Sequence, residues 1–142
     1  MDRKLFDKLI ESFGHIYVLT MSNRPDRRAL IEKQFLELGI PQPDMDARVR
    51  YFYGTPFPYN GLIADAFNRS GKGRFTKPNE YDCARNHYAI IKTAYDLGWE
   101  YVLVIEDDVL FLKDVEMWMI YLGNIPEDFD VLQGGGFTVD KL

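Results

Sequence analysis

The feature that most constrains this chain is an apolar, β-branched run that leads directly into three acids. Residues 101–105 read YVLVI, which is typical of a buried strand, and Glu106, Asp107 and Asp108 follow. Carboxylates held this close disfavour one another's ionisation, and a divalent cation such as Mg²⁺ or Mn²⁺ would remove that penalty. A solvated turn whose acids cap the following segment explains the same spacing, so both interpretations stay open. If the strand continues through the triplet, Glu106 and Asp108 share one side and Asp107 faces the other.

Helices are predicted between the strands along most of the chain. Apolar spacing and end signals favour helices at residues 5–13, 25–38, 80–97 and 114–122, with a short one at 62–67. Strands are predicted at 15–21, 48–53, 101–105 and 130–133, and loops at 54–61 and 68–78. Strands separated by helices indicate an α/β fold with a largely parallel sheet, in which ligands gather beyond the carboxyl ends of the strands.

Two of these helices carry more specific expectations. Ser22 or Asn23 is expected to cap the helix that begins at Pro25, whose fixed backbone angle suits the first helical position. The helix at 80–97 is expected to end at Gly98 and to bury one stripe of side chains. That stripe contains Ala84, His87, Tyr88, Ile91, Ala94 and Tyr95.

Composition restricts the class of protein and its partners. The 142 residues, with 46% hydrophobic content, fit one packed domain over residues 1–142, and the net charge of −5 argues against nucleic acid as a partner. The single cysteine, Cys83, can form no internal disulfide. No stretch approaches the ~18 apolar residues of a membrane helix, and the first residues lack the continuous apolar core of a signal peptide. We therefore expect a cytoplasmic protein with no transmembrane segment.

A basic loop between a strand and a helix start is the second candidate site. Residues 23–28 read NRPDRR. Arginines in such a loop can hold phosphates, and the free N–H groups of the helix terminus favour anions. Asp26 can accept bonds from a ribose or a base, or it can simply stabilise the helix start. A charged, capped helix terminus is the alternative to a phosphate site.

Two other phosphate chemistries fit the sequence less well. A phosphatase of the aspartyl-phosphate type needs two aspartates one residue apart, and position 106 is a glutamate while position 109 is a valine. A P-loop is rejected because Ala66 and Gly73 stand where its first glycine and its Ser/Thr are required.

The histidines and the cysteine give little sign of a metal site. Cys83 and His87, with only His15 besides, make a poor zinc set. Cys83 is therefore interpreted as a small buried hydrophobe. His87 is interpreted as a hydrogen-bonded core residue or, alternatively, as a residue that shapes a ligand site.

Two segments resemble family 25 glycosyltransferases, the group of lipooligosaccharide-type and collagen-type sugar transferases. The first is residues 16–28, IYVLTMSNRPDRR, which is similar to the family's strand followed by an Arg-Pro-x-Arg pattern. Arg24, Pro25 and Arg27 match, whereas Thr20 and Met21 stand where Asn-Leu is usual.

The second segment is residues 80–111, which resembles the family's Gly-Cys-x-x-Ser-His helix, strand and Glu-Asp-Asp triplet. Cys83, His87 and the whole triplet match, whereas Asp82 and Asn86 stand where Gly and Ser are usual. The two segments lie in the family's order and, with the chain between them, extend the resemblance over about residues 16–136.

This resemblance implies an A-type glycosyltransferase fold, a UDP-sugar-like donor and a divalent metal, commonly Mn²⁺, held by Asp108 with Glu106. The residues it implies in donor binding are Thr20, Arg24, Asp26, Arg27, His87, Glu106 and Asp107. The implied reaction moves a sugar from a nucleotide-sugar to the hydroxyl of a saccharide or other acceptor, in the synthesis of lipopolysaccharide (LPS) or another cell-surface polysaccharide. No residue is assigned as the catalytic base.

Family members usually continue beyond the position at which this chain stops, Leu142, and build the acceptor side there. Two hypotheses therefore stay open, an active glycosyltransferase and a non-catalytic binding module that lacks the acceptor half. The sheet edge that such a missing part would leave exposed favours a homodimer or a partner subunit.

Overall fold

A parallel three-stranded sheet organises the chain in the computed structural model, which describes residues 4–54 and 78–132. Strand β1 (Ile16–Thr20) lies in the middle, between β2 (Val49–Tyr53) and β3 (Leu103–Glu106). Both neighbours pair with β1 in parallel, and Ile16 lies opposite Val49 on one side and Leu103 on the other. The predicted α/β class with a largely parallel sheet is confirmed.

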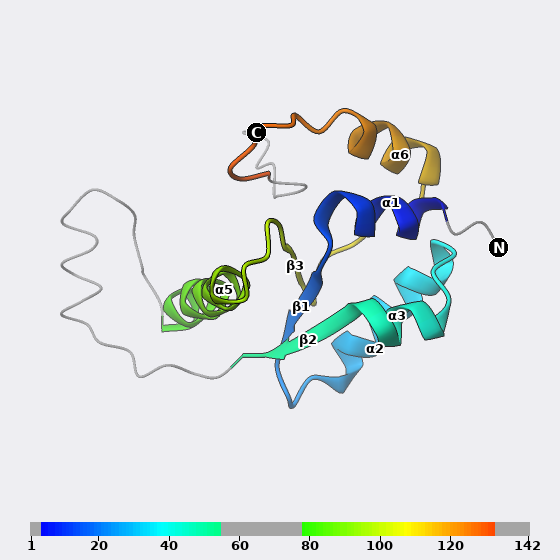
Figure 1. Cartoon of the computed structure of the whole chain (residues 1–142). Coiled ribbons are helices and arrows are strands. Elements are labelled where there is room, and N and C mark those ends of the chain that lie inside the picture. Colours follow the sequence, from blue (N-terminus) through cyan, green and yellow to red (C-terminus); the bar gives the residue numbers. More distant parts are fainter. Residues whose placement is uncertain (1–3, 55–77, 133–142) are drawn as a thin grey trace, which may run out of the picture.

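Five helices surround this sheet in the part of the chain that the structure describes. They are α1 (Lys4–Phe13), α2 (Pro25–Glu37), α3 (Gln42–Arg48), α5 (Pro78–Asp96) and α6 (Val115–Gly123). Figure 1 shows that α5 stands apart on one side of the strands, whereas the other four helices gather on the opposite side. Within residues 4–54 and 78–132, no helix is both long enough and apolar enough to cross a membrane.

The main core lies between the sheet and the four gathered helices. Helix α1 contributes its predicted apolar stripe, which is buried because Leu5, Leu9 and the residues next to them recur at helical spacing. From β1, alternate residues Ile16 and Val18 enter the same cluster, as the period of a strand requires. The other members of this cluster include Phe6, Phe13, Ile31, Phe35, Leu38, Ile40, Met45, Val49, Ile105 and Leu122.

Three predicted helix ends are confirmed, and one predicted cap is wrong. Gly14 and Gly98 follow α1 and α5 with φ of 71° and 70°, a conformation that glycine adopts without strain. Helix α2 begins at Pro25 as predicted, but its N-cap residue is Arg24 and no side chain caps it. Ser22 and Asn23 are excluded from the cap because a proline in the first helical position makes the preceding residue the N-cap. At α6 the side chain of Asp114 caps the helix by accepting the N–H of Met117 at 3.1 Å.

Several predicted boundaries need correction. Helix α3 was not predicted, because its first turn carries a proline that is tolerated only at a helix start. Strand β3 begins at Leu103, two residues after the predicted start. No strand forms over residues 130–132, where Val131 and Leu132 are exposed and have no ladder partner. The predicted helix at 62–67, the loops at 55–61 and 68–77, and Gln133 lie outside the described residues.

The predicted buried stripe of α5 is confirmed at Ala94 and wrong at most of its other positions. The buried row is Asn86, Ile90 and Ala94. The predicted members that are exposed instead are Ala84, Tyr88, Ile91 and Tyr95. Asn86 can be buried because its side-chain N–H donates to the carbonyl of Asp82 at 2.8 Å, one turn earlier in the same helix. Because this row contains a polar residue, the spacing of apolar residues alone did not identify it as the buried side of α5.

Candidate functional site

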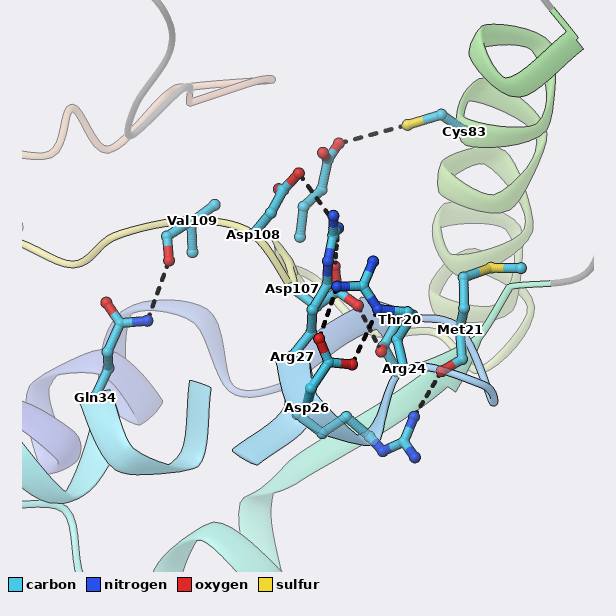
Figure 2. Close-up of polar contacts among 12 residues, drawn as sticks. Thr20, Met21, Arg24, Asp26, Arg27, Gln34, Cys83, Asp107, Asp108 and Val109 are labelled. Atoms are coloured by element: carbon cyan, nitrogen blue, oxygen red, sulfur yellow. Dashed lines mark hydrogen bonds and ion pairs between the residues drawn. The ribbon is translucent and has the colours of Figure 1, made fainter. Parts of the chain in front are cut away.

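The two predicted loops meet at one edge of the sheet. Strands β1 and β3 are parallel neighbours, so their carboxyl ends lie side by side. The backbone N–H of Asp107 donates to the carbonyl of Leu19 at 3.1 Å, which closes the junction between the two strand ends. Figure 2 shows side chains from both loops, and from the first turn of α2, converging there.

Asp107 is the buried member of the acidic triplet, and only 6% of it is exposed. Its Oδ2 accepts the hydroxyl of Thr20 at 2.6 Å, and its Oδ1 accepts Nη1 of Arg27 at 3.0 Å. The guanidinium of Arg27 therefore offsets the charge of this carboxylate within the protein. With both oxygens already bonded, Asp107 positions the loop and has little capacity left to bind a metal.

Asp108 is the open member of the triplet, because the chain turns after Glu106 and the strand does not continue. Its side chain is 58% exposed, and its Oδ2 lies 3.5 Å from Nη1 of Arg27. The alternation expected for a continuing strand is therefore not observed. Arg27 instead bridges the buried Asp107 and the exposed Asp108 (Figure 2).

Glu106 faces α5. Its Oε1 lies 2.8 Å from Nε2 of His87 and 3.5 Å from Sγ of Cys83. Burial, and then the negative charge of Glu106, raise the pKa of Cys83 to about 11. Cys83 is half-buried and contacts a carboxylate, so its interpretation as a plain buried hydrophobe is wrong. His87 is hydrogen-bonded as predicted, but it is half-buried and is not a core residue.

His15 lies away from this group. Its ring stacks on Trp99 with centroids 3.6 Å apart. Burial, and then the charges of Arg50 and Arg48, lower the pKa of its imidazole.

The loop after β1 is held by its own charges. Nε and Nη2 of Arg24 donate to the two carboxylate oxygens of Asp26 at 2.9 and 2.7 Å, and this bond lowers the pKa of Asp26 to about 2. Arg28 donates to the carbonyl of Met21 at 2.6 Å and lies over the ring of Tyr53. Both members of the Arg24–Asp26 pair remain accessible to solvent.

Comparison with known proteins decides the family. The model of glycosyltransferase family 25, described as LPS biosynthesis proteins, matches residues 13–136. This chain belongs to glycosyltransferase family 25. The small parallel sheet with its surrounding helices is consistent with a minimal glycosyltransferase domain of the A type that the family resemblance implied.

Three relatives illustrate how much of the family the chain covers. It is 31% identical over 114 residues to a lacto-N-neotetraose biosynthesis glycosyltransferase, LgtE, of Neisseria meningitidis serogroup B. The matched residues make up 80% of this chain and 39% of that protein. It is 31% identical over 111 residues to a glycosyltransferase 25 family member of Anopheles gambiae, covering 74% and 18%. It is 29% identical over 129 residues to the human inactive glycosyltransferase 25 family member 3, covering 78% and 22%. The chain thus spans less than half the length of each relative.

One residue that positions the site was missed by the sequence analysis. Gln34 of α2 is buried, and its side-chain N–H donates to the carbonyl of Val109 at 3.1 Å while its Oε1 accepts the N–H of Phe111 at 2.8 Å. Its amide therefore holds the segment that follows the acidic triplet of this family 25 protein. The sequence does contain a sign of this role, because Gln34 lies at helical spacing between the apolar residues Ile31 and Leu38 and is therefore on the buried side of the helix.

Gly54 is a second residue whose role only the packing reveals. Its N–H donates to the carbonyl of Thr20 at 2.7 Å, just beyond the end of β2. A Cβ at this position would come within 3.1 Å of both Nδ2 of Asn86 and Sδ of Met21. A side chain at this position would therefore require the side chains of Asn86 and Met21 to move slightly, so the absence of one lets β2 and α5 approach closely at the site edge.

Proposed function

We propose that this chain supplies the donor-binding side of a metal-dependent glycosyltransferase, which moves a sugar from a UDP-sugar-like donor to an acceptor hydroxyl. The observation that carries the proposal is the position of Asp108. It is the exposed carboxylate of the triplet, at the carboxyl end of β3 and next to Arg27. A carboxylate beside a guanidinium at this edge suits a metal-bound diphosphate.

The ligand set fits a hard divalent ion, Mn²⁺ or Mg²⁺. Asp108 would hold the ion with Glu106, since both side chains are partly exposed and offer carboxylate oxygens. Asp107 is a poorer ligand because Thr20 and Arg27 occupy its two oxygens. An ion bound there would offset the negative charge that develops on a departing diphosphate.

The side chains around Asp108 have separate tasks in this proposal. Arg27 and Arg24 offer guanidinium groups to the phosphates, close to the start of α2. Asp26 is available for a ribose or base if Arg24 leaves it for a phosphate. Thr20 keeps Asp107 in place beneath the donor, and His87 orients Glu106 through its 2.8 Å contact.

The names of the relatives suggest which kind of acceptor the proposed enzyme uses. One relative is named for lacto-N-neotetraose biosynthesis, and the family is described as LPS biosynthesis proteins. We extend this to a saccharide acceptor in the synthesis of a cell-surface polysaccharide. A cytoplasmic location and an association with a second copy or a partner subunit remain predictions.

A non-catalytic donor-binding module is the second candidate function. Two observations favour it. The human relative is named inactive, and in the described residues every acid of the triplet already has a side-chain partner, Asp108 through the 3.5 Å bond from Arg27. Such a module would bind the nucleotide-sugar without transferring the sugar.

Thermal unfolding of the full chain tests donor binding. UDP, UDP-glucose and UDP-galactose are each added with and without Mn²⁺, to wild type, to Asp108→Asn and to the exposed control Asp128→Asn. A ligand at about a hundred times its dissociation constant stabilises by ~2.7 kcal/mol, which is several degrees for a domain of this size. We expect a shift that needs both metal and nucleotide, persists in the control and vanishes in Asp108→Asn.

The remaining outcomes separate the alternatives. A metal-dependent shift accompanied by donor hydrolysis or transfer, both lost in Asp108→Asn, supports the enzyme. The same shift without turnover supports the binding module. No shift with any nucleotide means that the acidic triplet is structural in this chain and removes the proposal.

A further inference from the structure

Three metal-ligating side chains meet between α5 and the end of β3. They are Cys83, His87 and Glu106, and their Sγ, imidazole nitrogen and carboxylate oxygen all lie within 4.8 Å of one another. Oε1 of Glu106 is the shared centre, 2.8 Å from Nε2 of His87 and 3.5 Å from Sγ of Cys83. Figure 2 shows Cys83 projecting from α5 toward the strand end.

The backbone presents these groups as a set. Cys83 and His87 are four residues apart in α5, so one helix turn places both side chains on the same face. Glu106 is the last residue of β3, opposite that face. All three side chains are half-buried, so each is anchored and still accessible to an ion from solution.

The spacing suits a tetrahedral ion with thiolate, imidazole and carboxylate ligands. At the usual zinc bond lengths, such ligands lie about 3.4–3.6 Å from one another. The Cys83–Glu106 separation of 3.5 Å already meets this value. The His87–Glu106 separation is that of a hydrogen bond, and it has to open by roughly half an ångström when an ion replaces the proton.

We propose that Cys83, His87 and Glu106 form a Zn²⁺ site with its fourth position open to water. Binding of zinc releases the proton of the Cys83 thiol to solvent. The resulting thiolate and the imidazole of His87 favour zinc, whereas Mn²⁺ and Mg²⁺ favour the oxygen ligands at Asp108. Three protein ligands with one open position leave the ion exchangeable. This site goes beyond the proposed function, because zinc binding requires neither a nucleotide nor turnover.

Glu106 links the two sites, which gives zinc a regulatory consequence. An ion held by Cys83 and His87 takes Oε1 of Glu106 away from the donor metal. Zn²⁺ is therefore expected to weaken Mn²⁺-dependent binding of the nucleotide-sugar, and Cys83→Ser is expected to relieve that effect. This consequence rests on the proposed function, whereas the zinc site does not.

Cobalt spectroscopy on the full chain tests the site directly. Co²⁺ takes tetrahedral zinc sites and gives a thiolate-to-metal charge-transfer band, and Cys83 is the sole cysteine of the chain, so that band reports this residue alone. We expect the band in wild type, its removal on adding Zn²⁺, and its loss in Cys83→Ser. His87→Gln is expected to weaken zinc more than about tenfold, since even outer-shell partners of a zinc site are worth about 10–100-fold in affinity.

Two matched controls separate this site from its surroundings. His15→Gln removes the only other histidine, which stacks on Trp99, and is expected to keep the band. Asp108→Asn is expected to keep the band while losing the nucleotide shift, so the two proposals fail independently. Circular dichroism verifies that each variant is folded.

Wild-type protein provides a test that needs no variant. Alkylation of Cys83 is followed by mass spectrometry without metal, with Zn²⁺ and with Mn²⁺. Slower alkylation with Zn²⁺ but not with Mn²⁺ supports the site. Equal alkylation under all three conditions, a cobalt complex without the thiolate band, or unchanged zinc affinity in folded Cys83→Ser would overturn it.

Discussion

The two faces of the sheet are built in different ways. On one face, α1, α2, α3 and α6 close over Ile16 and Val18 with an almost entirely apolar cluster. On the other, α5 is the helix that covers the sheet in the part of the chain that the structure describes (Figure 1), Trp99 just after it stacks on Tyr17, and the inner row of α5 includes the polar Asn86. Its outer side leaves large residues such as Tyr95 in solvent.

One face therefore contributes mainly to the stability of the fold, and the other carries polar side chains of the candidate site. The apolar face buries the side chains whose removal leaves a cavity, and the hydrophobic effect stabilises it without regard to the site. The α5 face carries Cys83 and His87, which contact Glu106 through polar atoms. The junction between the faces is Thr20 with Asp107, where the central strand ends.

The largest expected loss of stability comes from truncating a buried side chain on the apolar face. Phe35 is 2% exposed, and its ring lies 5.1 Å from that of Phe111, so Phe35→Ala is expected to lower the free energy of unfolding by about 3–5 kcal/mol. Tyr95 is 82% exposed, so Tyr95→Ala is expected to change it by less than about 0.5 kcal/mol. Urea unfolding of both variants measures the contrast, and comparable losses would refute the division into two faces.

The next largest loss of stability is expected from removing the hydrogen bond between Thr20 and Asp107 at the end of the central strand. Thr20→Val keeps the side-chain shape but removes the hydroxyl that donates to buried Asp107 at 2.6 Å, and should lower the free energy of unfolding by about 1.5–3 kcal/mol. Thr93→Val in α5 is the matched control, because that hydroxyl donates to the carbonyl of Ala89 one turn earlier in its own helix. Its free energy of unfolding should change by less than about 0.5 kcal/mol. Chemical denaturation compares them, and an equal effect at both threonines would mean that the junction is not special.

A smaller effect tests the support beneath the acidic triplet. Gln34→Met removes both side-chain bonds to Val109 and Phe111, and is expected to cost about 1–2 kcal/mol. Lys33→Met on the exposed side of α2 should cost less than about 0.5 kcal/mol. Hydrogen exchange at the Phe111 amide should accelerate in the first variant only. An unchanged exchange rate in Gln34→Met would show that the amide does not hold this segment.

The smallest effect is a titration on the α5 face. Burial, and then Arg50 and Arg48, hold the pKa of His15 below its ordinary 6.5. Because the unfolded chain binds this proton more readily, the contribution of His15 to stability is complete above pH 6.5 and declines as the pH falls toward the folded pKa. Histidine-ring NMR should give a midpoint below 6.5, and Arg50→Gln should raise it part of the way. A midpoint at or above 6.5 would contradict the burial of this ring.

Local patterns predicted most of the elements but not all of their faces. The apolar spacing of α1, the proline that starts α2 and the glycines after α1 and α5 are all readable, because helix geometry and glycine conformation act within a few residues. The buried row of α5 was misassigned, because Asn86 satisfies its amide within the helix and so tolerates burial. Helix α3 was missed because two prolines near its start resemble a loop.

The sequence by itself determined the strand that ends in three acids, the arginine loop before α2 and the family to which both belong. Only the tertiary structure decided how the three acids differ. Thr20 and Asp107 are 87 residues apart, and the register between β1 and β3 is what brings them within 2.6 Å. The same register turns Glu106 toward Cys83 and His87 and leaves Asp108 exposed. No local pattern specifies that register, because it depends on pairing between two strands that lie far apart in the chain.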